Sequence, residues 1–372
     1  MRVTINHSGR WLLAGVCAVA CAAITACGSS GSSSNGGTTS SGSAQGQSAK
    51  SVTLDGIKIP VDGPLKLAVF LPGTNNADLQ SRVKELHRRI DAIPGASLTI
   101  FDAKFDVTIQ LNQIQNAIQS GKYNAAIAAP LDGQLLCSAL SQQAPKAGML
   151  VAVPNLALCG RYGREGDAQR APGTLTFVGG TQTVSYWHDY LTWIAKQNPG
   201  PQKVIVLTDP EGFPLTLNFD KALPEVQKAN PNLEVVGKAA TDLTVPGSNQ
   251  KMTALIQAHP DATILVTMFS TETQGAVEAL RAAGKLGKLK IYDKGATKWA
   301  VAQLKQGVIA ATSPERAVTS TTTMVDAILA ARDGKPFKAF YNNDGGPTPA
   351  DAPPSGFTVY TKQTIGDFQG EN

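Results

Sequence analysis

Short apolar segments alternate with amphipathic segments along most of the chain from residue 65 onward. The first apolar run, "LKLAVFL" (65–71), has the length of a buried strand, and apolar residues then recur at helical spacing over 76–90. The alternation continues through the runs "SLTIF", "YNAAIAA" and "MLVAV" and the helical stretches 107–119 and 133–147. Strands that alternate with helices in this way predict a parallel sheet covered by helices.

A loop rich in Gly, Arg and Pro interrupts the alternation over 160–173, after which the pattern restarts with "LTFVGG". Near the end, a helix is predicted over 318–332 and a strand over 356–362, so that the tail serves both lobes. We therefore predict an α/β fold of two doubly wound parallel-sheet lobes joined by a hinge. The predicted lobes are an N-terminal one of 61–179 plus about 316–344 and a C-terminal one of 180–315 plus about 345–372.

The N-terminal residues have the layout of an export signal. A basic start precedes an apolar stretch, 11–26, whose 16 residues are fewer than the roughly 20 of a membrane-spanning helix. The motif "ITAC" (24–27) resembles the bacterial lipobox, in which a peptidase cuts before a lipid-modified cysteine. This resemblance implies a lipoprotein signal peptide over 1–26 and an acylated Cys27, and the Ser/Gly-rich composition predicts a disordered tether over 27–60. An ordinary signal peptide that contains a cysteine is the alternative.

Charge and motif content exclude several classes of partner. The 33 basic and 28 acidic residues leave a net charge of +5, and no basic stripe with interleaved aromatic residues indicates nucleic-acid binding. The four histidines show no HxxxH or HExxH spacing, so we expect no metal site. The absence of a GxxxxGK[ST] motif also argues against an ATP site, and we expect no cofactor.

Cys137 and Cys159 are the only cysteines that follow Cys27. In an exported chain, two remaining thiols predict a disulfide. Two buried free thiols are the alternative.

Ligands of open parallel sheets bind outside the carboxyl ends of the strands, and two such lobes would bring these ends together across a cleft. Residues at the predicted strand ends are therefore the candidate ligand contacts. They are Thr74, Asn75, Asn76, Asp132 and Asn155 in the first lobe and Asp209, Phe269, Asp293 and Glu315 in the second. Tyr186 and Trp187, near the start of a predicted helix, are candidates for stacking on a ligand.

Each candidate also has a purely structural interpretation. Asn76 and Asp132 could cap the helices that follow them. Asp293 could lie in a surface turn, and Glu315 beside Arg316 could form an exposed ion pair. The aromatic residues of "SYWHDYLTW" (185–193) could belong to the core of the second lobe.

Three motifs in this order and spacing resemble the type I periplasmic sugar-binding proteins of ABC transporters, in particular the ribose-binding-like branch. They are "LAVFLPGTNNADLQ", "ALRAAGKLGKLKIYDKG" and "GVIAATSPE", and the resemblance covers about residues 65–362. It implies that Asn76 binds a hydroxyl, that Asp293 accepts two sugar hydroxyls, and that Glu315 lies at the hinge. The ribose pocket is not preserved, because Ala-Asp-Leu at 77–79 replaces a pair of aromatics and Pro-Asn at 154–155 replaces an Asp-Arg pair.

The resemblance implies a membrane-anchored extracytoplasmic solute-binding protein of an ABC importer. Such a protein binds a sugar or similar small polyhydroxylated ligand by hinge closure and presents it to permease subunits. We expect a monomer on the outer face of the cytoplasmic membrane or in the periplasm. A ligand-sensing lipoprotein that feeds a membrane receptor or kinase is the alternative. An enzyme is not expected, because no nucleophile, metal set or triad accompanies Asp132 and Asp293.

Overall fold

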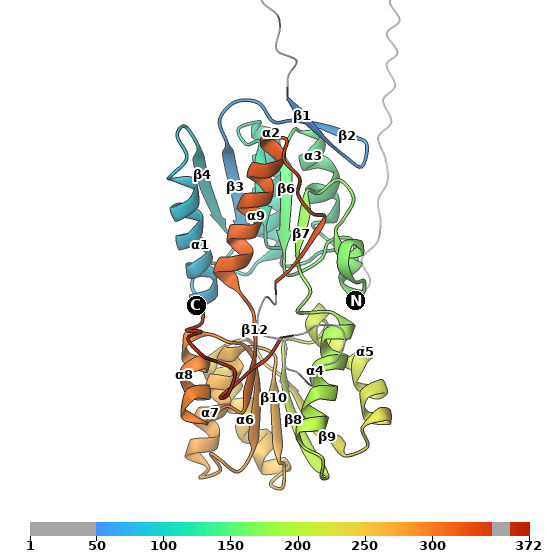
Figure 1. Ribbon diagram of the computed structural model, residues 1–372, viewed down its shortest axis with the longest axis vertical. Helices are drawn as coiled ribbons and strands as arrows, with labels where there is room; N and C mark the ends of the chain where they lie inside the picture. Colours follow the sequence, from blue (N-terminus) through green and yellow to red (C-terminus); the bar gives the residue numbers. More distant parts are fainter. Residues whose placement is uncertain (1–49, 344–357) are drawn as a thin grey trace, which may run out of the picture. The chain divides into compact units, whose positions relative to one another are not determined.

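The computed structural model describes residues 50–343 and 358–372, which form two α/β lobes (Figure 1). Each lobe is built on a six-stranded sheet with helices on both faces, so the predicted fold class is confirmed. Within these two ranges, no helix is both long and apolar enough to cross a membrane. The predicted signal peptide and Cys27 lie outside the described residues.

The first lobe contains a sheet of order β13-β7-β6-β5-β3-β4, in which every neighbouring pair is parallel. Its strands are β3 (Lys66–Leu71), β4 (Ser97–Asp102), β5 (Ala125–Ala128), β6 (Leu150–Pro154), β7 (Thr176–Gly179) and β13 (Phe340–Asn342). Its helices are α1 (Ala77–Ile90), α2 (Val107–Ser120), η1 (Ala139–Gln143), α3 (Ala144–Lys146), η2 (Arg161–Gly163), η3 (Gly166–Gln169) and α9 (Ala317–Arg332). The strands are continuous apolar runs because both faces are buried: Val69 packs in the cluster of α1 and α9, and Phe70 in that of α2 and η1.

The second lobe contains a sheet of order β14-β12-β11-β10-β8-β9, parallel except that β14 runs antiparallel to β12. Its strands are β8 (Gln202–Thr208), β9 (Leu233–Ala240), β10 (Ile264–Thr267), β11 (Lys290–Gly295), β12 (Ala311–Pro314) and β14 (Tyr360–Thr361). Its helices are α4 (Val184–Gln197), α5 (Pro214–Ala229), α6 (Val245–Ala258), α7 (Ser270–Ala282) and α8 (Lys298–Gln306). Val204 packs on the face covered by α4 and α5, and Ile205 on the face covered by α6, α7 and α8.

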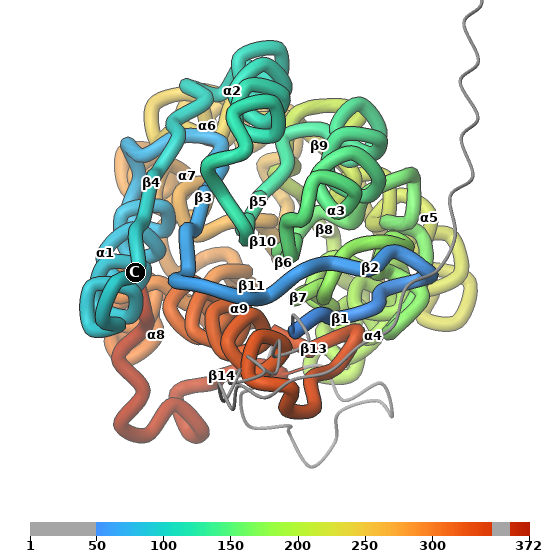
Figure 2. The backbone as a smooth tube through the Cα atoms, turned by 90° about the horizontal axis from the view of Figure 1, so that it is seen from above, coloured from blue at the N-terminus to red at the C-terminus, as the bar shows by residue number. Residues whose placement is uncertain are grey.

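Three connections pass between the two sheets. The chain leaves the first sheet after β7, returns after β12, and enters the second sheet again between β13 and β14. On its return, α9 packs beside α1 in the first lobe, as Figures 1 and 2 both show. The hinge predicted from the sequence would lie at these connections.

Residues 51–60, which the sequence analysis assigned to the tether, form an antiparallel hairpin of β1 (Ser51–Leu54) and β2 (Ile57–Pro60). The hairpin lies over the end of the first lobe in Figure 2 and buries Leu54 and Ile59 in its core. Asp55-Gly56 makes the two-residue turn, with both residues at positive φ. The assignment was wrong because it overlooked a short alternating pattern on either side of a typical Asp-Gly turn.

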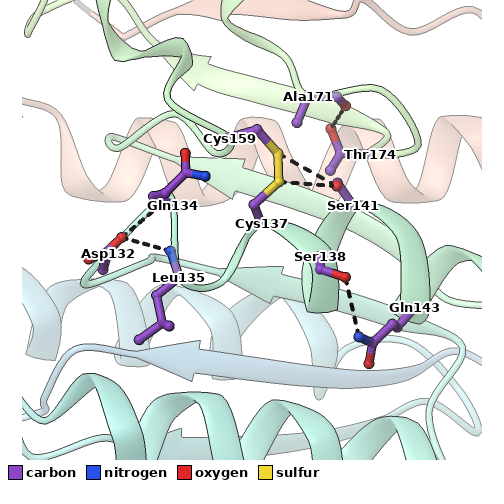
Figure 3. Close-up of a disulfide and its surroundings, with 10 residues drawn as sticks. All are labelled: Asp132, Gln134, Leu135, Cys137, Ser138, Ser141, Gln143, Cys159, Ala171 and Thr174. Carbon is purple, nitrogen blue, oxygen red and sulfur yellow. Dashed lines mark hydrogen bonds between the residues drawn. A yellow bond between two sulfur atoms is a disulfide. The ribbon is translucent and has the colours of Figure 1, made fainter.

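Cys137 and Cys159 form a disulfide, as predicted from their number and context (Figure 3). The bond ties the segment after β5 to the loop after β6. The Cys159 N–H donates to the Gly133 carbonyl at 2.7 Å in the same contact. Gly133 is required there, because a Cβ on it would lie 2.3 Å from the Ala157 carbonyl oxygen. On the chain-entropy model, closing a loop with a sequence separation of 22 stabilises the fold by about 3 kcal/mol.

Candidate functional site

A cavity of about 630 Å³ lies between the carboxyl edges of the two sheets. Its wall is formed by the loops that follow β3, β4, β5, β6 and β7 in the first lobe and β8, β9 and β10 in the second. Its polar side chains include Asn75, Asn76, Asn155, Gln182, Asp209, Asp242 and Thr244, and its aromatic side chains are Phe105, Phe213 and Phe269. This is the position at which open parallel sheets bind ligands.

Asn76 caps helix α1 and also lines the cavity. Its side-chain oxygen accepts the Leu79 N–H at 2.9 Å and so caps α1. The cap fixes the amide, whose nitrogen makes no hydrogen bond with any part of the chain that the structure describes. Asn76 can therefore cap the helix and still offer an N–H₂ donor to a ligand, so both interpretations from the sequence are compatible.

Asn155 lines the same cavity from the turn after β6. Its φ of 62° lies in the left-handed region, which Asn tolerates better than most residues. Its N–H donates to the Val178 carbonyl at 2.9 Å, which holds this turn against β7.

Two exposed phenylalanines of the cavity were not among the sequence candidates. Phe105, after β4, is 49% exposed, and Phe213, immediately before α5, is 36% exposed. Phe105 can approach the β3–α1 turn because residue 73 is glycine: a Cβ there would lie 2.4 Å from its ring. Phe105 lies in the loop after β4 and Phe213 in the loop after β8. A large apolar side chain in a polar loop is the signal that could have found them.

Asp293 does not line the cavity, contrary to the sequence expectation. The side chain is fully buried and accepts hydrogen bonds from the hydroxyls of Ser270, Thr273 and Thr312. Burial raises the pKa of Asp293 to about 6, while these three donors act in the opposite direction. Asp293 therefore joins β11 to α7 and β12 through these hydroxyls.

Tyr186 and Trp187 are also not part of the cavity wall. Trp187 is fully buried and packs edge-on against Phe219, with ring centroids 5.2 Å apart. Tyr186 is 3% exposed and lies beside Trp187 in the same cluster. Both belong to the core between α4, α5 and the sheet, which supports the structural interpretation of these aromatic residues.

Glu315 forms a buried ion pair with Lys294 rather than an exposed pair with Arg316, and it is not part of the cavity wall. Burial alone would raise the pKa of Glu315, but Lys294 holds that pKa below its usual value. The Lys294 ammonium lies 5.3 Å from the centre of the Phe269 ring, which itself lines the cavity. The ion pair is thus beneath the cavity wall.

The remaining candidates lie elsewhere. The Thr74 hydroxyl donates to Asp102 at 2.7 Å, and Thr74 is not part of the wall. Asp132 lines an adjoining pocket of about 470 Å³ that shares Leu131, Leu156, Phe213 and Pro214 with the cavity wall. Its carboxylate accepts the N–H groups of Gln134 and Leu135 (Figure 3). The structure therefore brings Asn75, Asn76, Asn155, Asp209 and Phe269 together and leaves the other candidates outside the cavity.

The described ranges 50–343 and 358–372 contain no group of three His, Cys, Asp or Glu side chains that could hold a metal ion.

Residues 67–336 match the family described as a periplasmic binding protein domain. The chain belongs to this family. No curated protein sequence matches the chain.

This periplasmic binding protein also has the fold of several solved structures. One is an ABC transporter solute-binding protein from Agrobacterium vitis with bound D-fucose: TM-score 0.68, 20% identity, 83% of this chain and 99% of that chain covered. Another is a solute-binding protein from Bacillus halodurans with bound myo-inositol: TM-score 0.69, 18% identity, 83% and 99% covered. A third, from Actinobacillus succinogenes with bound D-allose, has a TM-score of 0.66 at 16% identity, with 80% and 98% covered.

The family match makes the chain a periplasmic binding protein, and the neighbours show that it has the fold of sugar-bound solute-binding proteins. The expectation that the chain is not an enzyme is therefore confirmed by its family.

Proposed function

We propose that this periplasmic binding protein binds a sugar or similar small polyhydroxylated molecule in the cavity between its lobes. The observation that supports this most is a cavity wall in which side-chain amides and phenyl rings come from both sheets. Amides donate to and accept from adjacent hydroxyls, while the C–H face of a sugar packs on an aromatic ring. D-Fucose, myo-inositol and D-allose occupy proteins of the same fold, which supports the same ligand class here.

A ligand that contacts both lobes stabilises the form in which they close on it. Closure around a sugar, followed by recognition of the closed form by the permease of an ABC importer, is the function we assign to the protein. The names of the structural neighbours, which are ABC transporter solute-binding proteins, support the importer context.

A screen of sugars and polyols by thermal shift tests ligand binding, because a ligand at 100 times its Kd stabilises the native state by about 2.7 kcal/mol. For a sugar that binds, we expect Asn76→Ala to weaken affinity about tenfold, the equivalent of one lost hydrogen bond of roughly 1.4 kcal/mol. The affinity is measured by titration calorimetry.

The matched control is Asp106→Ala, which removes the exposed N-cap of α2 outside the cavity. Both substitutions cost cap stability of about 1 kcal/mol, but only Asn76→Ala should lower affinity. Equal affinities for Asn76→Ala, Asp106→Ala and the wild type would remove Asn76 from the site. A screen in which no sugar or polyol binds would contradict the proposed function.

We also propose that Cys27, at the seam between the apolar stretch and the Ser/Gly-rich segment, carries the lipid that anchors the protein. We expect Cys27→Ser to move the protein from the membrane fraction to the soluble fraction. Cys21→Ser, in the same N-terminal stretch, is the control and should stay with the membrane. The proposal fails if Cys27→Ser remains membrane-bound or if mass spectrometry finds an unmodified Cys27 in the wild type.

A further inference from the structure

Asp209 has a buried carboxylate oxygen without a hydrogen-bond donor. The residue directly follows β8, lines the cavity and is 3% exposed. Its Oδ1 finds no partner in the described part of the chain. The hydroxyls of Thr208 and Thr216 donate to the Asp209 backbone carbonyl instead, at 2.9 and 3.4 Å. Buried polar atoms in native proteins are rarely left in this state unless a ligand or water completes them.

The carboxylates that interact electrostatically with Asp209 are satisfied by the protein itself. Glu272 accepts the N–H groups of Met268 and Phe269 at 2.8 and 3.2 Å and the hydroxyl of Thr241 at 2.8 Å. Glu315 is paired with Lys294, the cation whose charge lowers the pKa of Asp209. The missing donor of Asp209 is therefore not supplied by either neighbour.

The two ionisable side chains of the cavity wall are both acidic. They are Asp209 and Asp242, and no Lys, Arg or His belongs to the wall that the structure describes. Asp242 is already satisfied, since its Oδ1 accepts the N–H and the hydroxyl of Thr244 at 3.0 and 2.7 Å. Lys294 is committed to Glu315 behind the Phe269 ring. An anionic ligand would enter beside two carboxylates with no cation to pair with, which is costly in a partly desolvated site.

We infer that the Asp209 carboxylate is the polar anchor of the ligand in the second lobe and that it accepts an O–H or N–H donor from the ligand. The cavity consequently selects neutral or amino sugars and rejects sugar acids and sugar phosphates. Phe213, from the same loop as Asp209, and Phe269, from the loop after the neighbouring strand β10, line the same cavity and are available to pack on the ligand. This inference rests on the proposed function. It adds the charge of the ligand, neutral or cationic, and names Asp209 as the residue that selects it.

Titration calorimetry with two matched trios tests the inference: D-galactose, D-galactosamine and D-galacturonate, and the corresponding D-glucose series. In a trio that binds, we expect the uronate to bind at least about tenfold more weakly than the neutral sugar. Asp209→Asn should weaken binding of the neutral sugar about tenfold, because a neutral amide is a weaker acceptor than a carboxylate. The same substitution should also reduce the difference in affinity between the neutral sugar and the uronate.

The amino sugar distinguishes the two donors. A larger loss for the amino sugar than for the neutral sugar in Asp209→Asn identifies an ammonium at Asp209, and equal losses identify a hydroxyl. Asp220→Asn, an exposed carboxylate on α5 that pairs with Lys238 outside the cavity, is the control and should bind like the wild type.

Two outcomes overturn the inference while leaving sugar binding intact: a uronate that binds as tightly as its neutral partner, or an Asp209→Asn variant that binds every sugar like Asp220→Asn. If neither trio nor any polyol of the wider screen binds the wild type, the proposed function itself is wrong and the inference falls with it. Thermal unfolding of Asp209→Asn, measured alongside, shows that the variant is folded.

Discussion

Replacement of Lys294 by methionine is expected to lower the free energy of unfolding by about 3–5 kcal/mol. The lysine side chain is fully buried and pairs with Glu315, of which only 8% is exposed. Methionine keeps most of the apolar volume but leaves the Glu315 carboxylate buried without its cation. The loss thus comes from an uncompensated charge rather than from a cavity.

Denaturant unfolding measures this effect, with Lys298→Met as the matched control. Lys298 begins α8, four residues along the chain, and is exposed, so its replacement should change stability by no more than about 0.5 kcal/mol. The double variant Lys294→Met/Glu315→Gln should recover much of the loss, since it removes the stranded charge. A Lys294→Met protein as stable as Lys298→Met would show that the ion pair is not as buried as described.

The free energy of unfolding is expected to fall as the pH rises from about 5 to 8. Burial raises the pKa of Glu272 to about 8, and Asp209 adds to that increase. Burial likewise raises the pKa of Asp209 to about 7 and of Asp293 to about 6. Between the unfolded and folded pKa values the folded state binds more protons than the unfolded state, so it loses stability as these protons leave.

Glu272→Gln should remove about 3 kcal/mol of that fall, because glutamine keeps the hydrogen bonds of Glu272 but does not ionise. Its oxygen can accept the N–H groups of Met268 and Phe269, and its amide can donate to Thr241. Carboxyls whose pKa is lowered, such as Glu315 and Glu85, affect stability at lower pH and do not oppose this trend.

Guanidinium unfolding at pH 5 and pH 8 compares the wild type with Glu272→Gln and with Glu278→Gln, an exposed carboxylate of the same helix. Only Glu272→Gln should reduce the difference in the free energy of unfolding between pH 5 and pH 8. If all three proteins lose the same stability between the two pH values, Glu272 does not carry a raised pKa.

The fold was predictable because its signals are local. Each sheet is buried on both faces, so its strands are apolar runs such as 65–71, and each covering helix must present an apolar stripe at helical spacing. The disulfide was predictable because few cysteines remain in an exported chain. The hairpin of β1 and β2 was overlooked because it is short and precedes the first long apolar run.

The site was only partly predictable because it depends on where each strand ends. The apolar run "LKIYD" predicts a strand that ends at Asp293, whereas β11 continues to Gly295 and buries Asp293 within the sheet. Asn76 and Asn155 were identified correctly as strand-end residues because polar turn residues directly follow the apolar runs there. Whether they contact a ligand remains a prediction.

Partners from distant segments could not be read from the sequence. Lys294 and Glu315 are 21 residues apart and meet because β11 and β12 pair in register, with Lys294 opposite Ser313. Trp187 is buried because α4 packs both on the sheet and beside α5, which covers most of the surface of α4. The positions of aromatic residues along α4 therefore do not show which side of the helix faces solvent.

The central claim is that the cavity between the two lobes is the ligand site. A crystal structure of the protein with the sugar that gives the largest thermal shift tests it most directly. The account predicts a sugar between the amide of Asn76 and the ring of Phe269, with an O–H or N–H of the sugar on Asp209 Oδ1. A sugar bound elsewhere on the protein, with Asn76 and Asp209 free of ligand, would contradict it.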